Sequence, residues 1–137
     1  MNDCLFCKIA AKKIPANIMY EDAHAVAFLD ITPRAPGHTL VVSKYHAPKL
    51  VDLPDEEIAP LFVAVKKVAA ILSQKLAVDG MTIGINQGKV SIDEEVVDHL
   101  HVHLMPRWHG DGGGAVQSIV NNPPKEIAED ILKKIKE

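Results

Sequence analysis

Asp98-His99-Leu100-His101-Val102-His103-Leu104-Met105-Pro106-Arg107 is a stretch with a histidine at every second position and apolar residues between the histidines. In an extended strand, side chains at i, i+2 and i+4 point to the same face. A strand would therefore set three imidazoles in a row above an apolar underside that can pack, whereas a helix would scatter them around its circumference. We predict a β-strand here, with a functional site on its histidine face.

Three imidazoles on one strand fit two kinds of chemistry. Two of the rings, together with outside ligands, could hold a metal ion, because neutral imidazole is a common zinc ligand. Alternatively, one ring is a nucleophile or base while its neighbours fix its tautomer and bind an anion. A coincidental pattern in an ordinary half-buried strand is disfavoured, since histidine has no special strand preference and three of the seven histidines fall here.

The composition restricts the class of protein. A chain of 137 residues, 47% apolar and 24% charged, is typical of one soluble globular domain with its own core. The net charge of -3 does not favour nucleic acid or an anionic membrane as a partner. The chain has neither an apolar run long enough for a transmembrane helix nor a signal peptide at Met1-Asn2-Asp3-Cys4. We expect a cytoplasmic protein with reduced cysteines.

Hydrophobic patterning predicts five strands and two helices. The expected strands lie at residues 18–21, 25–29, 39–43 and 81–86 and in the histidine stretch, with the first two forming a hairpin. A long helix is expected at about residues 53–76, although Pro60 does not suit a helix interior. A short helix follows at about residues 125–136, capped by Asn121-Asn122-Pro123-Pro124. The fold class is therefore α+β, a five-stranded antiparallel sheet with one long and one short helix.

Cys4-Leu5-Phe6-Cys7 is a Cys-x-x-Cys motif at the start of the chain. By itself it is a weak zinc signal, because a structural zinc site usually has four ligands. A thioredoxin-type redox role is less favoured, since no strand precedes the motif. The remaining alternative is two small buried residues near a short helical turn.

The sequence resembles the histidine triad family, whose signature is His-x-His-x-His followed by two apolar residues. The residues from His99 to Met105 meet this signature at every place, and the similarity extends from Cys4 to about Ala115. It includes Tyr20-Glu21-Asp22, Phe28-Leu29-Asp30-Ile31, Pro36-Gly37-His38-Thr39-Leu40-Val41-Val42 and Lys44-Tyr45-His46. The resemblance implies one domain at residues 1–137, with a core at about 4–115 and a C-terminal helix at about 124–136. It also implies that the sheets of two copies join across a homodimer.

The resemblance implies a covalent nucleotidyl-transfer mechanism. His101 would attack the α-phosphorus of a nucleoside phosphate derivative, and water would then release the monophosphate. His103 would donate to the phosphate oxygens, and His99 completes the triad. Asp30 and Ile31 would hold the ribose and base, and Asn86 and His38 would line the pocket.

The resemblance also completes the metal hypothesis. In some bacterial members, a Cys-x-x-Cys, a later histidine and the first triad histidine hold a structural zinc. Cys4, Cys7, His46 and His99 occupy those positions. Two thiolates and two imidazoles make a full tetrahedral set.

One segment departs from the family pattern. Between Asn86 and His99 the chain is two residues longer than the family pattern, and Glu94-Glu95-Val96 stands where the family has Gly-Gln-x. An ionised Glu95 cannot donate to a phosphate and would repel it. The acids could project into solvent, Glu95 could serve as an acid near the leaving group, or catalysis could be weak. Our hypothesis is that the acidic segment favours cationic leaving groups.

The resemblance implies a cytoplasmic, homodimeric hydrolase of purine nucleoside phosphoramidates or related adenylates. Its partner would be a purine nucleotide that carries an AMP moiety, and structural zinc would be its metal. Three alternatives stay open. They are cleavage of dinucleoside polyphosphates, a nucleotide-binding or zinc-stabilised interaction module with little turnover, and a catalytic metal on the three histidines.

Overall fold

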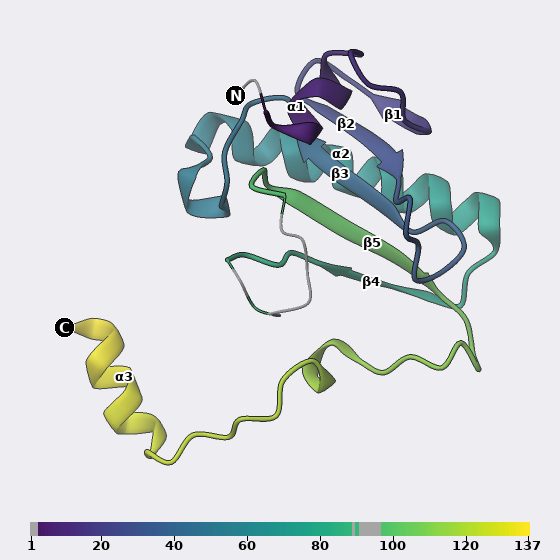
Figure 1. Cartoon of the computed structure of the whole chain (residues 1–137). Helices are drawn as coiled ribbons and strands as arrows, with labels where there is room; N and C mark the ends of the chain where they lie inside the picture. Colours follow the sequence, from purple (N-terminus) through teal and green to yellow (C-terminus); the bar gives the residue numbers. More distant parts are fainter. Residues whose placement is uncertain (1–2, 89, 91–96) are drawn as a thin grey trace.

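The computed structural model describes residues 3–88, 90 and 97–137. Within this part of the chain, five strands form one antiparallel sheet in the order β1-β2-β3-β5-β4 (Figure 1). The strands are β1 (Ile18–Glu21), β2 (Ala25–Leu29), β3 (Thr39–Ser43), β4 (Gly80–Gly84) and β5 (His101–Arg107). The helices are α1 (Leu5–Ala10), α2 (Asp55–Leu76) and α3 (Ala128–Lys136), with 3-10 turns at Leu50–Asp52 and Val116–Ser118.

The predicted fold class is confirmed, and the first three strands have the predicted bounds. The structure adds α1, which encloses the Cys-x-x-Cys motif with Cys4 as its N-cap. The strand expected at residues 81–86 lies one residue earlier and ends at Gly84, where the chain turns toward the segment before β5. The long helix begins at Asp55 and contains Pro60 near its start.

The last helix begins later than predicted, so the expected cap at Asn121-Asn122-Pro123-Pro124 is wrong. The residue at the N-cap of α3 is Ile127. Lys125 and Glu126 form a bend after the two prolines, so the first helical turn begins only beyond Ile127. Glu129 and Asp130 then occupy the first turn, where acidic side chains suit the positive end of the helix dipole.

The two faces of the sheet bury different clusters. One face packs on α2 through Ala25, Ala27, Val41, Val102, Leu104, Leu61, Ala64, Val65, Val68 and Leu72. The opposite face packs on α1 through Phe6, Ile9, Val26, Phe28, Leu40 and Val42. Because His101 pairs with Val42 and His103 pairs with Leu40, both histidines share the α1 face. The apolar underside of the histidine strand thus belongs to the α2 core.

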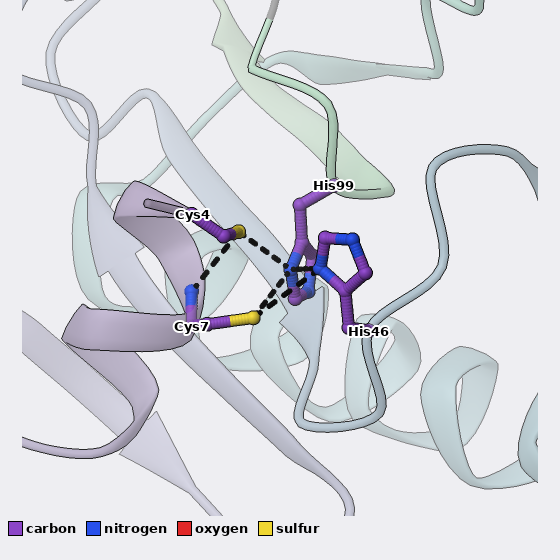
Figure 2. Close-up of side chains that lie close together, drawn as sticks. All are labelled: Cys4, Cys7, His46 and His99. Carbon is purple, nitrogen blue, oxygen red and sulfur yellow. Dashed lines mark hydrogen bonds between the residues drawn. The ribbon is translucent and has the colours of Figure 1, made fainter. Parts of the chain in front are cut away.

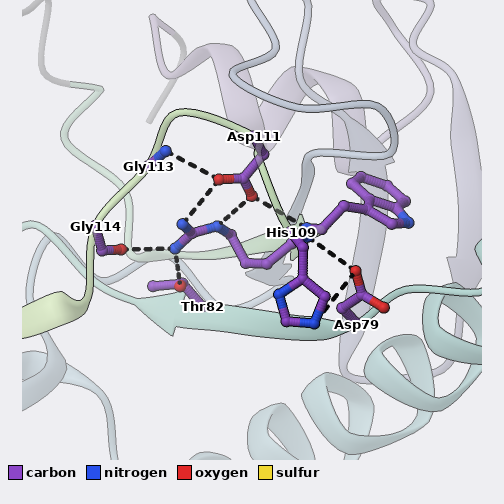
Figure 3. A network of polar contacts seen from close by, with 8 residues as sticks. Asp79, Thr82, His109, Asp111, Gly113 and Gly114 are labelled. Carbon is purple, nitrogen blue, oxygen red and sulfur yellow. Dashed lines mark hydrogen bonds and ion pairs between the residues drawn. The ribbon is translucent and has the colours of Figure 1, made fainter.

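A polar network holds the turn that follows β5 (Figure 3). Arg107 donates to both carboxylate oxygens of Asp111, to Thr82 Oγ1 on β4 and to the carbonyl of Gly114. The guanidinium lowers the pKa of the Asp111 carboxyl well below its usual range, so this ion pair persists at any ordinary pH. The turn directs the chain away from the sheet toward α3.

The C-terminal segment stands apart from the sheet (Figure 1). In α3 the structure buries no residue, and Ile127, Leu132 and Ile135 are exposed. Among the described residues, no helix combines the length and the apolar character needed to cross a membrane.

Candidate active site and metal centre

His101 and His103 lie side by side on β5, with their ring centroids 5.0 Å apart. Both are partly buried, and the alternate residues Val102 and Leu104 are fully buried beneath them. His99 precedes the strand and is completely buried among other partners. The row of three imidazoles predicted from the sequence is therefore divided, with two rings on the strand and one in a separate cluster.

The ring of His101 has a defined tautomer. Its Nδ1 lies 2.8 Å from the backbone carbonyl oxygen of His99. A carbonyl can only accept, so Nδ1 carries the hydrogen and Nε2 keeps its lone pair. A neutral imidazole held in this way is a competent nucleophile at Nε2.

A chain of hydrogen bonds fixes the tautomer of His103. The backbone N–H of Arg34 donates to His38 Nδ1 at 3.1 Å, so the hydrogen of a neutral His38 sits on Nε2. His38 Nε2 is 2.9 Å from His103 Nδ1, which must accept. His103 Nε2 therefore carries a hydrogen that can be donated to an anion. Burial, together with the neighbouring rings of His101 and His38, lowers the pKa of His103 to about 4, so this ring is neutral at physiological pH.

Asp30 joins the same group from the end of β2. Its Oδ1 accepts from the backbone N–H of Thr32 at 2.9 Å, and its Oδ2 lies 3.5 Å from His38 Nε2. Asp30, His38 and His103 thus place a carboxylate and two imidazoles within 4.8 Å of one another. Because the Arg34 amide already occupies the His38 Nδ1 lone pair, neutral His38 has none left at Nε2 for a metal. This group is a hydrogen-bond relay.

The loop between β2 and β3 brings His38 into the relay. Gly37 has φ +82° and lies against Leu76 of α2, where an added Cβ would overlap the leucine side chain. Only glycine combines this conformation with so close an approach. His38 itself is buried at 3% exposure at the start of β3.

The other residues predicted for nucleotide binding do not belong to the hydrogen-bond relay. Ile31 is 90% exposed beside Asp30, next to a surface hollow lined by Asp30, Arg34 and His38. Asn86 is exposed and lies two residues beyond Gly84, which pairs with His103 at the histidine end of β4. Glu95 lies outside the described residues.

Cys4, Cys7, His46 and His99 converge in a four-donor cluster, in which the donor atoms all lie within 4.8 Å of one another (Figure 2). His99 Nε2 donates to the carbonyl of Ser43 at 2.7 Å, which leaves its Nδ1 lone pair facing the cluster. This Nδ1 is 3.3 Å from Cys4 Sγ, 3.4 Å from Cys7 Sγ and 3.2 Å from His46 Nδ1. Cys7 Sγ is 3.3 Å from His46 Nδ1.

These separations fit a tetrahedral zinc site. Zinc bonds of about 2.1 Å to nitrogen and about 2.3 Å to sulfur place two nitrogens about 3.4 Å apart, and a nitrogen and a sulfur about 3.6 Å apart. Burial and the neighbouring Cys4 raise the pKa of the Cys7 thiol to about 11, so without a cation this thiol stays protonated. A bound cation would displace that proton and make the sulfur a ligand. The donor set therefore suits zinc.

Sequence reasoning missed three residues that fix the histidines. The Ser43 carbonyl and the Arg34 amide determine the tautomers of His99 and His38, but backbone groups leave no sequence signal. Phe6 contacts both His99 and His101. Its one available signal was its place inside the Cys-x-x-Cys motif.

Comparison with known proteins identifies relatives over most of the chain. Residues 11–110 match the HIT domain model. An uncharacterised HIT-like protein of Methanocaldococcus jannaschii is 44% identical over 133 residues, which cover 97% of this chain and 98% of the relative. A Saccharomyces cerevisiae protein named adenosine 5'-monophosphoramidase HNT1 is 37% identical over 132 residues, covering 96% of this chain and 77% of the relative.

Solved structures agree with these sequence matches. A HIT-family protein of Bacillus subtilis superposes with a TM-score of 0.83 at 35% identity, covering 98% of this chain and 93% of the other. A zinc-bound histidine triad family protein of Mycobacterium smegmatis gives a TM-score of 0.74 at 34% identity, covering 90% and 86%. The family model, the sequence relatives and the fold all agree, and the chain belongs to the HIT family.

Proposed function

We propose that this protein hydrolyses purine nucleoside phosphoramidates or related adenylates at the α-phosphorus. The observation that carries the proposal is the hydrogen bond from His101 Nδ1 to the His99 carbonyl, which leaves the lone pair of His101 on Nε2. The names of two fungal relatives, both adenosine 5'-monophosphoramidases, support this substrate class.

In the first step, His101 Nε2 attacks the α-phosphorus. A bond forms between nitrogen and phosphorus while the bond from phosphorus to the leaving amine breaks, and the amine departs with a proton from solvent. His103 Nε2–H donates to a phosphate oxygen, where negative charge grows in the transition state. Asp30 accepts from the ribose hydroxyls, with Ile31 against the base and Asn86 and His38 near the phosphate.

In the second step, water attacks the phosphorus of the nucleotidyl-histidine. The nitrogen–phosphorus bond breaks, the attacking water releases a proton to solvent, the monophosphate leaves, and His101 recovers its lone pair. The covalent route divides one difficult displacement into two easier ones. His99 contributes through its backbone carbonyl, which holds His101 in the reactive tautomer during both steps.

We propose further that Cys4, Cys7, His46 and His99 hold a structural zinc. The donor geometry supports this, as does the zinc-bound relative from Mycobacterium smegmatis. Zinc would supply a cross-link among α1, the segment after β3 and the segment just before β5. No step at phosphorus passes through it.

We also propose that residues 1–137 form one HIT domain, with a core at about residues 4–115, and that two copies associate in the cytoplasm. Net charge supports a small-molecule partner over nucleic acid or a membrane surface.

Turnover of a fluorogenic adenosine phosphoramidate tests the proposal. We expect the wild type to turn over and His101→Ala to lose at least about a thousandfold, because the nucleophile is absent. His109→Ala is the matched control, since the His109 side chain is 95% exposed. Acid quenching of the wild type should trap a nucleotidyl adduct at His101. An inert wild type that still binds AMP would replace the hydrolase with a nucleotide-binding module.

A further inference from the structure

We propose that Phe6 is a positioning residue that couples the four-donor cluster to the ring of His101. The effect on turnover rests on the proposed function, whereas the coupling itself does not. The proposal makes the cluster more than a cross-link, because cation binding would then set the geometry of a ring outside the donor set.

Phe6 lies between the two cysteines of the cluster on a helix of six residues. Cys4 caps α1, and Cys7 is in its first turn. The Phe6 side chain is 5% exposed and meets the ring of His101 edge-on, with centroids 5.1 Å apart and planes at 81°. It also meets the ring of His99 at 6.0 Å. One aromatic ring therefore touches both a cluster histidine and the proposed nucleophile.

The cluster and the nucleophile have a second link through the backbone. The His99 carbonyl accepts from His101 Nδ1 at 2.8 Å, while the His99 ring faces the cysteines and His46. That hydrogen bond selects the tautomer of His101. It leaves the ring free to tilt about the axis through Nδ1, and the Phe6 ring, packed at 81° to it, restricts this tilt on one side.

A six-residue helix is too short to hold its place by its own hydrogen bonds. Packing of Phe6 on Phe28, with centroids 5.4 Å apart, supplies part of the restraint on α1. Ile9 packs in the same cluster near the other end of α1. Without a cation, the first turn of α1 has in addition only thiol contacts of 3.3–3.4 Å, which are weak hydrogen bonds. Metal–sulfur bonds to Cys4 and Cys7 would fix both ends of the first turn of α1, and with them the Phe6 ring.

The test compares the His101 ring with and without zinc in three proteins. Nitrogen-15 NMR of the imidazole reports its tautomer and environment in wild type, Phe6→Leu and Phe62→Leu. Phe62→Leu is the control, because it makes the same change on α2 at a side chain that is 39% exposed. We expect zinc removal by a chelator to shift the His101 signals in wild type and in Phe62→Leu. In Phe6→Leu the shift should fall to less than half.

Two further measurements separate positioning from packing. Phe6→Tyr keeps the ring and should restore the response of His101 to zinc. At saturating phosphoramidate, zinc-loaded Phe6→Leu should lose about tenfold in kcat, because a misplaced nucleophile reacts slowly. Its zinc affinity should stay near that of the wild type.

The coupling would be overturned if zinc removal shifted the His101 signals of Phe6→Leu as much as those of the wild type. It would also be overturned if zinc removal left the His101 signals of the wild type unchanged. Phe6→Met, which keeps most of the volume without a ring, replaces Phe6→Leu if the leucine variant does not fold. The NMR readout needs no turnover. A protein that shows the coupling but no hydrolysis would therefore contradict the proposed function alone.

Discussion

His38 and His101 owe their tautomers to backbone neighbours that cannot change roles. An amide N–H always donates and a carbonyl always accepts, so the Arg34 amide and the His99 carbonyl determine where the hydrogen of each imidazole lies. The backbone contact of His38 reaches His103 through one side-chain hydrogen bond, from His38 Nε2 to His103 Nδ1. The backbone therefore holds His101 in the nucleophilic tautomer directly and His103 in the donating tautomer through His38.

The depressed pKa of His103 predicts a pH-dependent stability. An unfolded His103 binds a proton below its ordinary pKa of 6.5, but the folded ring does so only near pH 4. The contribution of His103 to the unfolding free energy is therefore complete above pH 6.5 and is lost as pH falls through 4. Its slope is at most about 1.4 kcal/mol per pH unit.

Urea unfolding at fixed zinc between pH 4.5 and 7.5 checks this contribution. His103→Asn should flatten the rise of the unfolding free energy with pH by part of that slope. His109→Asn, which changes an exposed ring, should keep the wild-type slope. Parallel pH profiles for wild type and His103→Asn would show that the ring is not buried as described.

The sequence predicted which residues meet at the site better than how they meet. The alternation of histidines predicted the histidine face of β5, and the resemblance to the histidine triad family assigned the four donors of the cluster to Cys4, Cys7, His46 and His99. The Ser43 and Arg34 contacts depend on backbone groups 56 and four residues away from the histidines they hold. Such contacts follow from the path of the chain and have no residue-type signature.

At the scale of elements, α2 ends on a residue that the sequence does not favour there. Ala77 is the C-cap and has φ +50°, in the left-handed region where a Cβ is crowded. Ala77→Gly should raise the unfolding free energy by about 0.5–1 kcal/mol, because glycine relieves this strain. Ala70→Gly, in the exposed middle of α2, should lower it by about 1 kcal/mol. Chemical denaturation of both variants measures the two changes in unfolding free energy. Equal destabilisation by Ala77→Gly and Ala70→Gly would contradict the left-handed conformation of Ala77.

The zinc proposal predicts a thermal response that depends on α1. Adding zinc should raise the Tm of the metal-free wild type, since a ligand at a hundred times its Kd stabilises by about 2.7 kcal/mol. Cys7→Ser and His46→Ala should lose most of this response, because each removes one of the four donors. Lys8→Ala changes the residue next to Cys7 and should respond as the wild type does. If zinc raised the Tm of Cys7→Ser as much as that of the wild type, zinc would bind at another site.

Strands were easier to predict than helix ends. Asp22 follows the end of β1, and Gly37 lies in the loop just before β3 begins. Asp22 accepts from the backbone N–H groups of His24 and Ala25 in the hairpin turn. Helix α1 was missed because six residues are too few to show a helical period. The start of α3 depends on the conformation after Pro124, which the apolar spacing of its isoleucines does not encode.

The two edges of the sheet differ in a way that bears on the whole molecule. Edge strand β1 has four residues and an irregular register, and Glu21 is paired with Lys12 and Lys44. Short, charged and irregular edges resist pairing with another chain. Of the described strands, only β5 pairs with β4, whose Ile83 is 44% exposed. The proposed homodimer therefore fits the β4 edge better than the β1 edge.

Ile83→Lys should dissociate this homodimer. A lysine on the β4 edge would carry an unpaired charge into an interface, and a loss of about 3 kcal/mol raises the dissociation constant about a hundredfold. Sedimentation velocity across a range of protein concentrations measures the change. Val51→Lys is the matched control, because Val51 is 84% exposed and lies in the 3-10 turn before α2 rather than in a strand. Circular dichroism should be the same for wild type and both variants, since neither side chain is buried within one chain.

If Ile83→Lys associates as tightly as the wild type, the copies do not meet at β4, and a second lysine at Met19 of β1 would then test the other edge.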